Sequence, residues 1–209
     1  KNEKETNLTY GEIDNLVDHF IFFLKKNYTK IELYSNIVSI HSSANLCSVI
    51  SMLALSKMGI TNSVFFNDLS HEAIKLRLKL LNSKIIISSA NNIDFKNKIL
   101  KLKRVKKLKF SEEVFANKHI KSINFDSLIL KKNVNPYNYK YNFVKSNHPS
   151  FVLFTSGTTG VPKGIVHSTG GYILYSKYTC LKQFGMNQKS VILTASDAGW
   201  INGHTYALF

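Results

Sequence analysis

Cysteine is scarce in this chain: Cys47 and Cys180 are the only two among 209 residues. Two cysteines cannot build a disulfide framework, and their spacing is not that of a metal site. The sequence also has no apolar run of the roughly 18 residues that a membrane span requires, and no apolar segment typical of a secretion signal near its start. We therefore expect a cytoplasmic protein in a reducing compartment, without a membrane partner.

Arginine is nearly missing although the chain is strongly basic. The formal net charge is +15, yet only Arg77 and Arg104 are arginines among 28 Lys and Arg residues. Specific recognition of phosphates and bases relies largely on the planar arginine fork, so this charge does not by itself indicate a nucleic-acid partner, and we expect none. We interpret the densest basic run, residues 98–109, as a solvated helix face or a strand edge.

The pattern of apolar residues predicts alternating helices and strands. A chain of this length with 44% hydrophobic residues can bury a substantial core. Residues 10–27 are expected to form an amphipathic helix that begins with a capping box between Thr9 and Glu12. Further helices are predicted at 45–59, ended by Gly59, and from the N-cap Ser70 to residue 82. Short buried strands are predicted at 36–42, 62–66 and 84–89. This alternation favours an α/β fold with a mostly parallel sheet flanked by helices.

The pattern is weaker in the second half of the chain. Residues 123–130 are expected to form a strand and one helical turn, and 131–149 a polar connector. A strand at 150–154, a helix at 169–185 and a strand at 190–196 complete the expected elements.

A loop rich in glycine and hydroxyl groups follows the strand at 150–154. Residues 154–164 read FTSGTTGVPKG. This is not a Walker A loop, because the position of its second glycine is taken by Pro162 and no Ser or Thr follows Lys163. Glycines at 157, 160 and 164 still allow close approach of the backbone to a ligand, the neighbouring hydroxyls can donate to phosphate, and Lys163 adds a positive charge. The alternative is a polar surface loop without a ligand.

Residues 153–172, LFTSGTTGVPKGIVHSTGGY, resemble the signature loop of the adenylate-forming (AMP-binding) superfamily. ASDAGWINGHTY at 195–206, together with 9–20 and 63–88, is similar to the acetyl-CoA synthetase branch of short-chain acyl-CoA synthetases. The resemblance implies that ATP adenylates a short carboxylic acid to acyl-AMP and that coenzyme A then takes the acyl group. It implies ATP, Mg²⁺ and coenzyme A as substrates or cofactors, and a cytoplasmic ligase whose partners are small molecules.

The same resemblance assigns site residues. The phosphates of ATP would be bound by Thr155, Ser156, Gly157, Thr158, Thr159, Gly160 and Lys163, with Thr159 also near Mg²⁺. The acyl pocket would be formed by Trp200, Ile201, Asn202 and Gly203, although a lone Trp beside an apolar segment is also a common core residue. A catalytic role is open to His167 and His204, but both are expected to be structural or hydrogen-bonding, because an ionised carboxylate needs no protein base.

Two departures from the family pattern concern coenzyme A. Asn67 and Asp68 stand where relatives have two glycines, and the arginines that relatives use for coenzyme A have no clear match, so Lys96 and Lys98 are the candidates. The identity of the acyl acceptor therefore stays less firmly predicted than adenylation.

Elements that the family requires elsewhere are not found in these residues. They are the adenine motif, the acidic residue for the ribose and the C-terminal lid domain with its catalytic lysine. We therefore expect residues 1–209 to be part of the N-terminal adenylation domain of a longer enzyme, inactive alone and without a catalytic residue of their own. The alternatives are a propionate-activating enzyme, an adenylating enzyme with another acyl acceptor, and a non-catalytic nucleotide-binding or basic interaction module.

Overall fold

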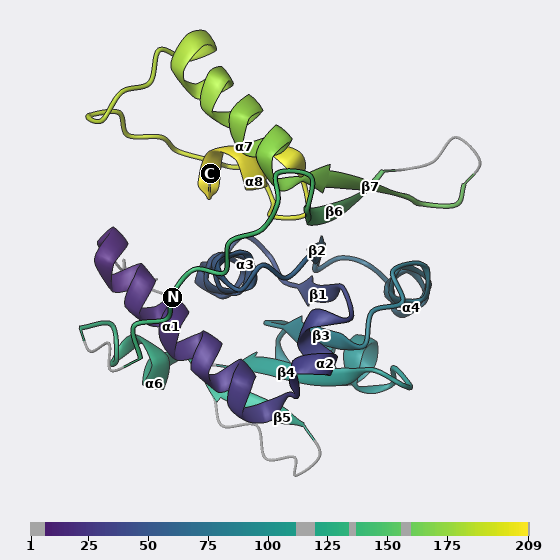
Figure 1. Ribbon diagram of the computed structural model, residues 1–209. Helices are drawn as coiled ribbons and strands as arrows, with labels where there is room; N and C mark the ends of the chain where they lie inside the picture. Colours follow the sequence, from purple (N-terminus) through teal and green to yellow (C-terminus); the bar gives the residue numbers. More distant parts are fainter. Residues whose placement is uncertain (1–6, 112–119, 134–136, 156–159, 209) are drawn as a thin grey trace.

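The computed structural model describes residues 7–111, 120–133, 137–155 and 160–208. In these residues seven strands form one sheet with the order β5-β4-β3-β1-β2-β6-β7 (Figure 1). The strands are β1 Val38–His41, β2 Asn62–Phe65, β3 Ile85–Ser88, β4 Lys106–Ser111, β5 Lys121–Asn124, β6 Pro149–Thr155 and β7 Lys163–Ser168. Every neighbouring pair is parallel except β6 and β7, which form an antiparallel hairpin. The predicted α/β fold with a mostly parallel sheet is confirmed.

Helices connect and cover the strands. They are α1 Tyr10–Asn27, α2 Lys30–Tyr34, α3 Leu46–Lys57, α4 His71–Leu80, α5 Asn92–Asp94, α6 Phe125–Ile129, α7 Thr169–Tyr178 and α8 Ile201–Ala207, with π-helical turns η1 Phe95–Leu100 and η2 Thr179–Gln183. The caps predicted from sequence are present: Thr9 and Glu12 form a capping box on α1, and Ser70 caps α4. Gly59 adopts a φ of +70° directly after α3, as expected for a helix stop. No described helix has the length and apolar character needed to cross a membrane.

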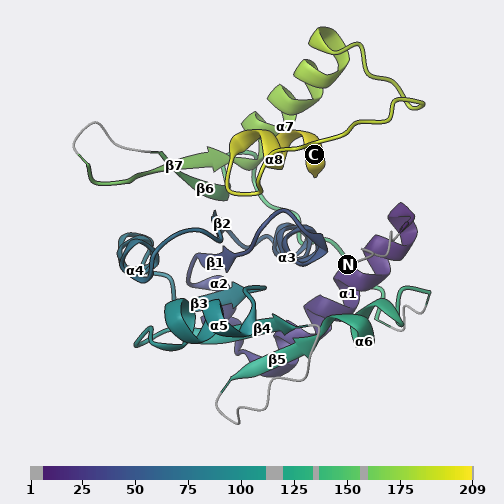
Figure 2. The ribbon, with the colours of Figure 1, turned by 180° about the vertical axis from the view of Figure 1, so that it is seen from behind.

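The strands of the central sheet are buried on both faces. In β3, Ile85 and Ile87 belong to one apolar cluster and Ile86 to the other, because successive side chains point to opposite faces. The first cluster is formed with α1 and α3, and the second with α4 and η1. Figures 1 and 2 show these helices on opposite sides of the sheet. Burial on both faces explains why the strands read as short continuous apolar runs rather than alternating ones.

The second half of the chain adds a further layer, formed by the β6–β7 hairpin, α7 and α8 (upper part of Figure 1). It joins the central sheet through a short parallel bridge between Asn62 and Phe151. Two side chains reinforce the junction: Thr61 Oγ1 donates to the Pro149 carbonyl at 2.7 Å, and Ser63 Oγ donates to the Val152 carbonyl at 2.6 Å. The sheet thus places the end of β6 at the carboxyl edge of the parallel strands.

One expectation from the sequence holds only in part, and one is wrong. Lys101, Lys103 and Arg104 of the basic run are exposed, but its last residue, Lys109, lies in β4 between β3 and β5 and is only 1% exposed. The Nζ of Lys109 donates to the Asn92 side chain and lies over the Phe95 ring, so an amide on α5 and an aromatic ring on η1 make its burial possible. Residues 190–196 form no strand. Val191 and Leu193 are almost fully exposed there and have no neighbouring strand within the described part of the chain.

Candidate active site

The glycine-rich loop joins the two strands of the β6–β7 hairpin. Thr155, the last residue of β6, pairs directly with Lys163, the first residue of β7. Residues opposite each other in an antiparallel pair have Cβ atoms about 5 Å apart, so the pairing brings the Thr155 hydroxyl and the Lys163 stem to the same end of the hairpin. Of the seven residues predicted to bind phosphate, Thr155, Gly160 and Lys163 are described. Ser156, Gly157, Thr158 and Thr159 lie outside the described residues.

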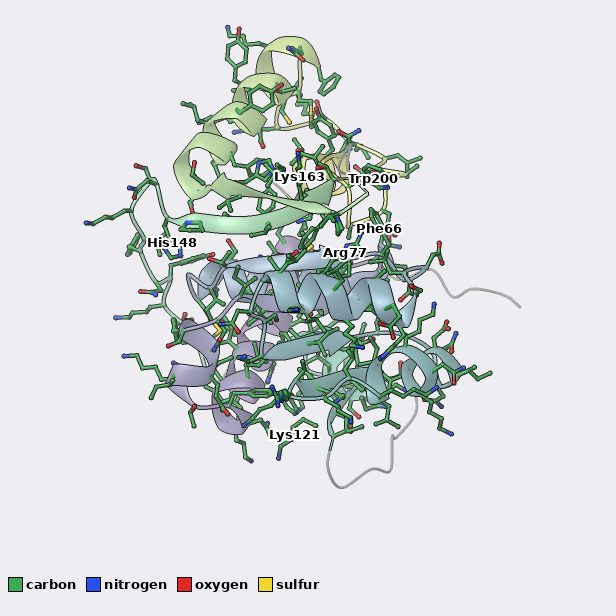
Figure 3. The ribbon with its side chains drawn as sticks, turned by 90° about the vertical axis from the view of Figure 1, so that its right-hand side faces the viewer. Phe66, Arg77, Lys121, His148, Lys163 and Trp200 are labelled. Carbon is green, nitrogen blue, oxygen red and sulfur yellow. The ribbon has the colours of Figure 1, made fainter. Side chains whose placement is uncertain are left out.

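The described part of the loop is open. Gly160 has a φ of +78°, a left-handed conformation that glycine adopts without steric cost, and its hydrogen side faces open space. Lys163 is exposed, and no hydrogen bond or ion pair of its ammonium group is found within the described residues (Figure 3). Its charge is therefore available to an anion. These features are those of a loop that approaches a ligand with its backbone.

Trp200 lies at the beginning of α8 and contacts Phe66, which follows β2. The ring centroids are 5.3 Å apart and the ring planes are inclined by 51° (Figure 3). Trp200 is 61% exposed, so it is not a core residue. Gly199 fits closely against this pair: a Cβ added there would lie 2.5 Å from Phe66 Cε1. The two aromatic side chains thus form an exposed apolar wall that requires a glycine beside it.

The other residues predicted for the acyl pocket differ in their exposure to solvent. Ile201 and Asn202, the first two residues of α8, are both exposed, whereas Gly203 is buried. A Cβ on Gly203 would lie 2.3 Å from the Asp197 carbonyl oxygen, so its backbone packs directly on the turn before Trp200. The resemblance placed all four residues in an acyl pocket, with Gly199, Gly203 and His204 favouring a loop, but a seven-residue helix carries three of the four.

A cluster of aromatic rings holds α7 and α8 against the hairpin. Phe151 of β6 lies between His167, with ring centroids 4.6 Å apart, and His204, at 4.4 Å. Tyr172 of α7 meets Phe151 edge-on, and its hydroxyl lies 2.8 Å from Thr205 Oγ1 on α8. Both histidines are therefore part of the packing, as the sequence analysis expected.

The protonation state of His204 follows from its burial. The side chain is fully buried, and Nδ1 donates to the Trp200 carbonyl at 3.3 Å in the tautomer that this geometry favours. Burial lowers the pKa of His204 to about 4, against this hydrogen bond and with a smaller contribution from His167. A neutral imidazole is thus present at neutral pH.

Lys98 is engaged within the protein. Its Nζ donates to the Asn67 carbonyl at 2.9 Å and lies 3.3 Å from Asp94 Oδ1. It therefore ties the loop after β2, which contains the Asn67–Asp68 departure, to η1. Lys96 is exposed, and the coenzyme A role of both lysines stays a prediction.

Two residues that the sequence analysis did not single out adjoin the site. Phe66 forms the wall with Trp200, and the guanidinium of Arg77 lies over the Phe154 ring at 5.3 Å (Figure 3). The second of two consecutive aromatic residues, at the end of the strand predicted at 62–66, was the available signal for Phe66. Nothing local in the sequence links Arg77 to Phe154, because the contact joins α4 to β6.

The described side chains do not by themselves form a metal site. Among them no group of three or more His, Cys, Asp or Glu side chains could hold a metal ion. Thr159, which the resemblance suggested near Mg²⁺, is not among them. We therefore derive no step through Mg²⁺, and its participation stays a prediction.

Comparison with known proteins identifies the family. The family model of AMP-binding enzymes matches residues 2–209. The chain belongs to the AMP-binding enzyme family. Acetyl-coenzyme A synthetase 1 of Candida glabrata is 34% identical over 78% of this chain and 25% of its own length. The mitochondrial acyl-CoA synthetase short-chain family member B of Dictyostelium discoideum is 31% identical over 97% of this chain and 31% of its own length.

Comparison with solved structures supports the fold of this AMP-binding chain. The acetoacetyl-CoA synthetase of Streptomyces lividans superposes with a TM-score of 0.81 over 97% of this chain and 32% of its own, at 16% identity. This likeness concerns the fold alone, whereas the family model and the named synthetases confirm the resemblance to the adenylate-forming superfamily and its short-chain branch. The chain spans about a quarter to a third of the length of the curated relatives named here.

Proposed function

We propose that the protein is an acetyl-CoA synthetase that activates acetate with ATP and transfers the acetyl group to coenzyme A. The observation that carries the proposal is the hairpin loop, in which Thr155 and Lys163 stand opposite each other and Gly160 has a left-handed backbone. The family match and the names of relatives such as the Candida glabrata synthetase support the same conclusion.

In the first step a carboxylate oxygen attacks the α-phosphorus of ATP. A bond forms between them, the bond to the bridging oxygen breaks, and pyrophosphate leaves with the electron pair, giving acetyl-AMP. Two anions must approach, and their repulsion at about 4 Å rises from ~1 kcal/mol in water to several kcal/mol in a drier site. The Lys163 ammonium group and the hydroxyl and amide donors of residues 155–160 would stabilise the charge on pyrophosphate as it departs.

In the second step the sulfur of coenzyme A attacks the acetyl carbonyl. The thioester forms, the acyl–phosphate bond breaks, AMP leaves and the thiol proton is released. We assign no residue of this chain to that proton transfer. The interactions of Lys98 with Asn67 and Asp94 leave the exposed Lys96 as the more available of the two lysines proposed for coenzyme A.

The acid would be held near the start of α8, where Trp200, Ile201, Asn202 and Gly203 are proposed to line its pocket. Trp200 and Phe66 together offer an apolar wall that would limit the length of the acyl chain. Family members commonly have Val-Thr at 201–202, and the change to Ile-Asn alters the polar group. Propionate is therefore the second candidate substrate.

The test is acid-dependent exchange of labelled pyrophosphate into ATP by the full-length protein, with acetate, propionate and butyrate compared under identical conditions. We expect exchange with acetate and formation of the thioester when coenzyme A is added. If exchange is fastest with propionate, then propionate and not acetate is the substrate. Exchange without thioester formation would indicate another acceptor. A protein that binds ATP but shows no exchange with any acid would favour the non-catalytic module.

A further inference from the structure

A groove lined by positively charged side chains lies away from the proposed ATP site. Its volume is about 480 Å³, within the range of small-ligand pockets. Six cationic residues line it: Lys75, Lys79, Lys84, Lys101, Lys103 and Arg104. They come from α4, from the turn between α4 and β3, and from the turn between η1 and β4. The two turns are joined by a hydrogen bond from the Lys106 N–H to the Lys84 carbonyl at 2.8 Å.

Most of this charge has no partner among the residues that the structure describes. Lys75 lies 3.3 Å from Glu72, but both side chains are largely exposed. For Lys79, Lys84, Lys101, Lys103 and Arg104, no side-chain hydrogen bond or ion pair is found among the described residues, and no acidic residue lines the groove. The carboxyl ends of α4 and η1 contribute about half a negative charge each. Within the described part of the chain, about four of these five positive charges therefore stay uncompensated.

The backbone at Arg104 gives an independent indication. Arg104 has a φ of +60°, a left-handed conformation that glycine and asparagine tolerate better than arginine. Asn82, in the turn on the other side of the groove, has a φ of +50°, and its residue type suits that conformation. Arg104 thus places a long cationic side chain at a turn position where glycine or asparagine would be less strained.

The groove lies at the opposite edge of the sheet from the glycine-rich loop. Lys84 directly precedes β3, and the 101–105 turn precedes β4, so both lie at the amino ends of parallel strands. The loop follows β6, which runs parallel to β2 and therefore ends at the carboxyl edge. A ligand in the groove would not occupy the proposed active site.

We propose that this groove binds a small soluble anion with three or more closely spaced phosphoryl groups. Several lysines act as point charges suited to phosphate oxygens. The described lining contains no Phe, Tyr or Trp on which a base could stack, and a single arginine, which argues against recognition of single-stranded RNA. The size of the groove also matches a compact ligand rather than an extended polymer.

The test is calorimetric titration of the full-length protein with sodium tripolyphosphate in the Lys163→Ala background, which weakens binding at the proposed ATP loop. We expect binding that weakens several-fold between 50 and 200 mM salt. The triple variant Lys101→Gln, Lys103→Gln, Arg104→Asn is expected to bind at least tenfold more weakly. In the matched control, three exposed lysines on or after α7 are changed to Gln: Lys177, Lys182 and Lys189. Its affinity for tripolyphosphate is expected to stay within twofold of that of the Lys163→Ala protein.

A second variant tests the groove without altering the 101–105 turn, in case the triple variant misfolds there. Lys79→Gln with Lys84→Gln removes two charges from the other side of the groove and is expected to weaken binding as well. Equal loss in the groove and control triples would overturn the proposal, because net charge alone would then explain the binding. Binding of a 20-nucleotide uridine RNA but not of tripolyphosphate would overturn it in favour of a nucleic-acid surface.

Discussion

The indole ring of Trp200 packs at an inclined angle against the phenyl ring of Phe66, with centroids 5.3 Å apart, and so connects the start of α8 to the end of β2. This contact crosses from the later layer of the chain to the central sheet. It places the residues proposed for the acyl pocket beside the loop that carries Asn67 and Asp68. The position of the wall therefore depends on the backbone next to Trp200, where Gly199 leaves no room for a side chain.

Gly199→Ala is expected to displace this wall. The added Cβ would lie 2.5 Å from Phe66 Cε1, which forces the phenyl ring or α8 to move and costs about 1–3 kcal/mol of the free energy of unfolding. Gly11→Ala is the matched control, since a Cβ there meets nothing within 4 Å and the residue lies in α1. We expect the control to stabilise the protein by about 0.5–1 kcal/mol. Urea unfolding measures both, and equal effects at the two positions would contradict the close fit at Gly199.

The sequence predicted the elements whose signals are local. α1 and α4 have their expected caps, and α3 ends where Gly59 takes a left-handed backbone. Such signals depend on hydrogen bonds and dihedral angles within a few residues, so they can be recognised without knowledge of the tertiary structure. The loop at 154–164 was recognised from its glycines and hydroxyl groups, but β7, which follows it, was not predicted.

The sequence did not predict features that depend on distant partners. Lys109 is buried because Asn92 and Phe95 receive its side chain, and a basic run alone suggests a solvated surface. Residues 190–196 have the apolar composition of a strand, but a strand also needs a neighbour that pairs with it. The helix α8 was not expected, because the family resemblance and the neighbouring Gly199, Gly203 and His204 favoured a pocket loop there. Phe66 likewise belongs to the wall only through its contact with Trp200.

A buried ion pair joins α1 to α3, and breaking it is expected to destabilise the fold strongly. Lys57 Nζ lies 2.7 Å from Asp18 Oδ1 and 2.8 Å from Asp14 Oδ1. The Asp18 side chain is 0% exposed, so Lys57→Ala would leave a buried carboxylate without its counter-charge, at a cost of about 3–5 kcal/mol. Asp14 is 48% exposed, and Asp14→Asn is expected to cost less than about 1 kcal/mol. Urea unfolding of the two variants gives the comparison. Similar losses would show that Asp14, not Asp18, is the main partner.

The stability of the fold is expected to fall as the pH is lowered from 6.5 to 4. Burial lowers the pKa of His204 to about 4, while an unfolded histidine has a pKa near 6.5. The unfolded state therefore binds the proton first. The contribution of neutral His204 to the unfolding free energy is therefore fully present above pH 6.5. About 3 kcal/mol of it is lost as the pH falls through 4.

His204→Phe tests this origin because it keeps a ring against Phe151 but cannot be protonated. We expect the unfolding free energy of the parent to fall relative to that of the variant as the pH falls from 6.5 to 4. His41, whose pKa burial also lowers to about 4, is present in both proteins and cancels in the comparison. A difference that stays constant over this range would mean that His204 does not titrate between the folded and unfolded states.

The charge of Lys163 is expected to matter for the first chemical step rather than for folding. The side chain is exposed, and no hydrogen bond or ion pair of its ammonium group is found among the described residues, so Lys163→Ala should leave the unfolding free energy within about 0.5 kcal/mol of the parent. A charge-assisted interaction with the departing pyrophosphate is worth about 1.5–3 kcal/mol, which corresponds to a loss of roughly 10- to 100-fold in kcat/KM for acetate-dependent exchange. Lys163→Arg retains the charge and is expected to recover part of this loss. If Lys163→Ala exchanges pyrophosphate at the parent rate, the ammonium group does not face the phosphates, and the role proposed for the hairpin loop is wrong.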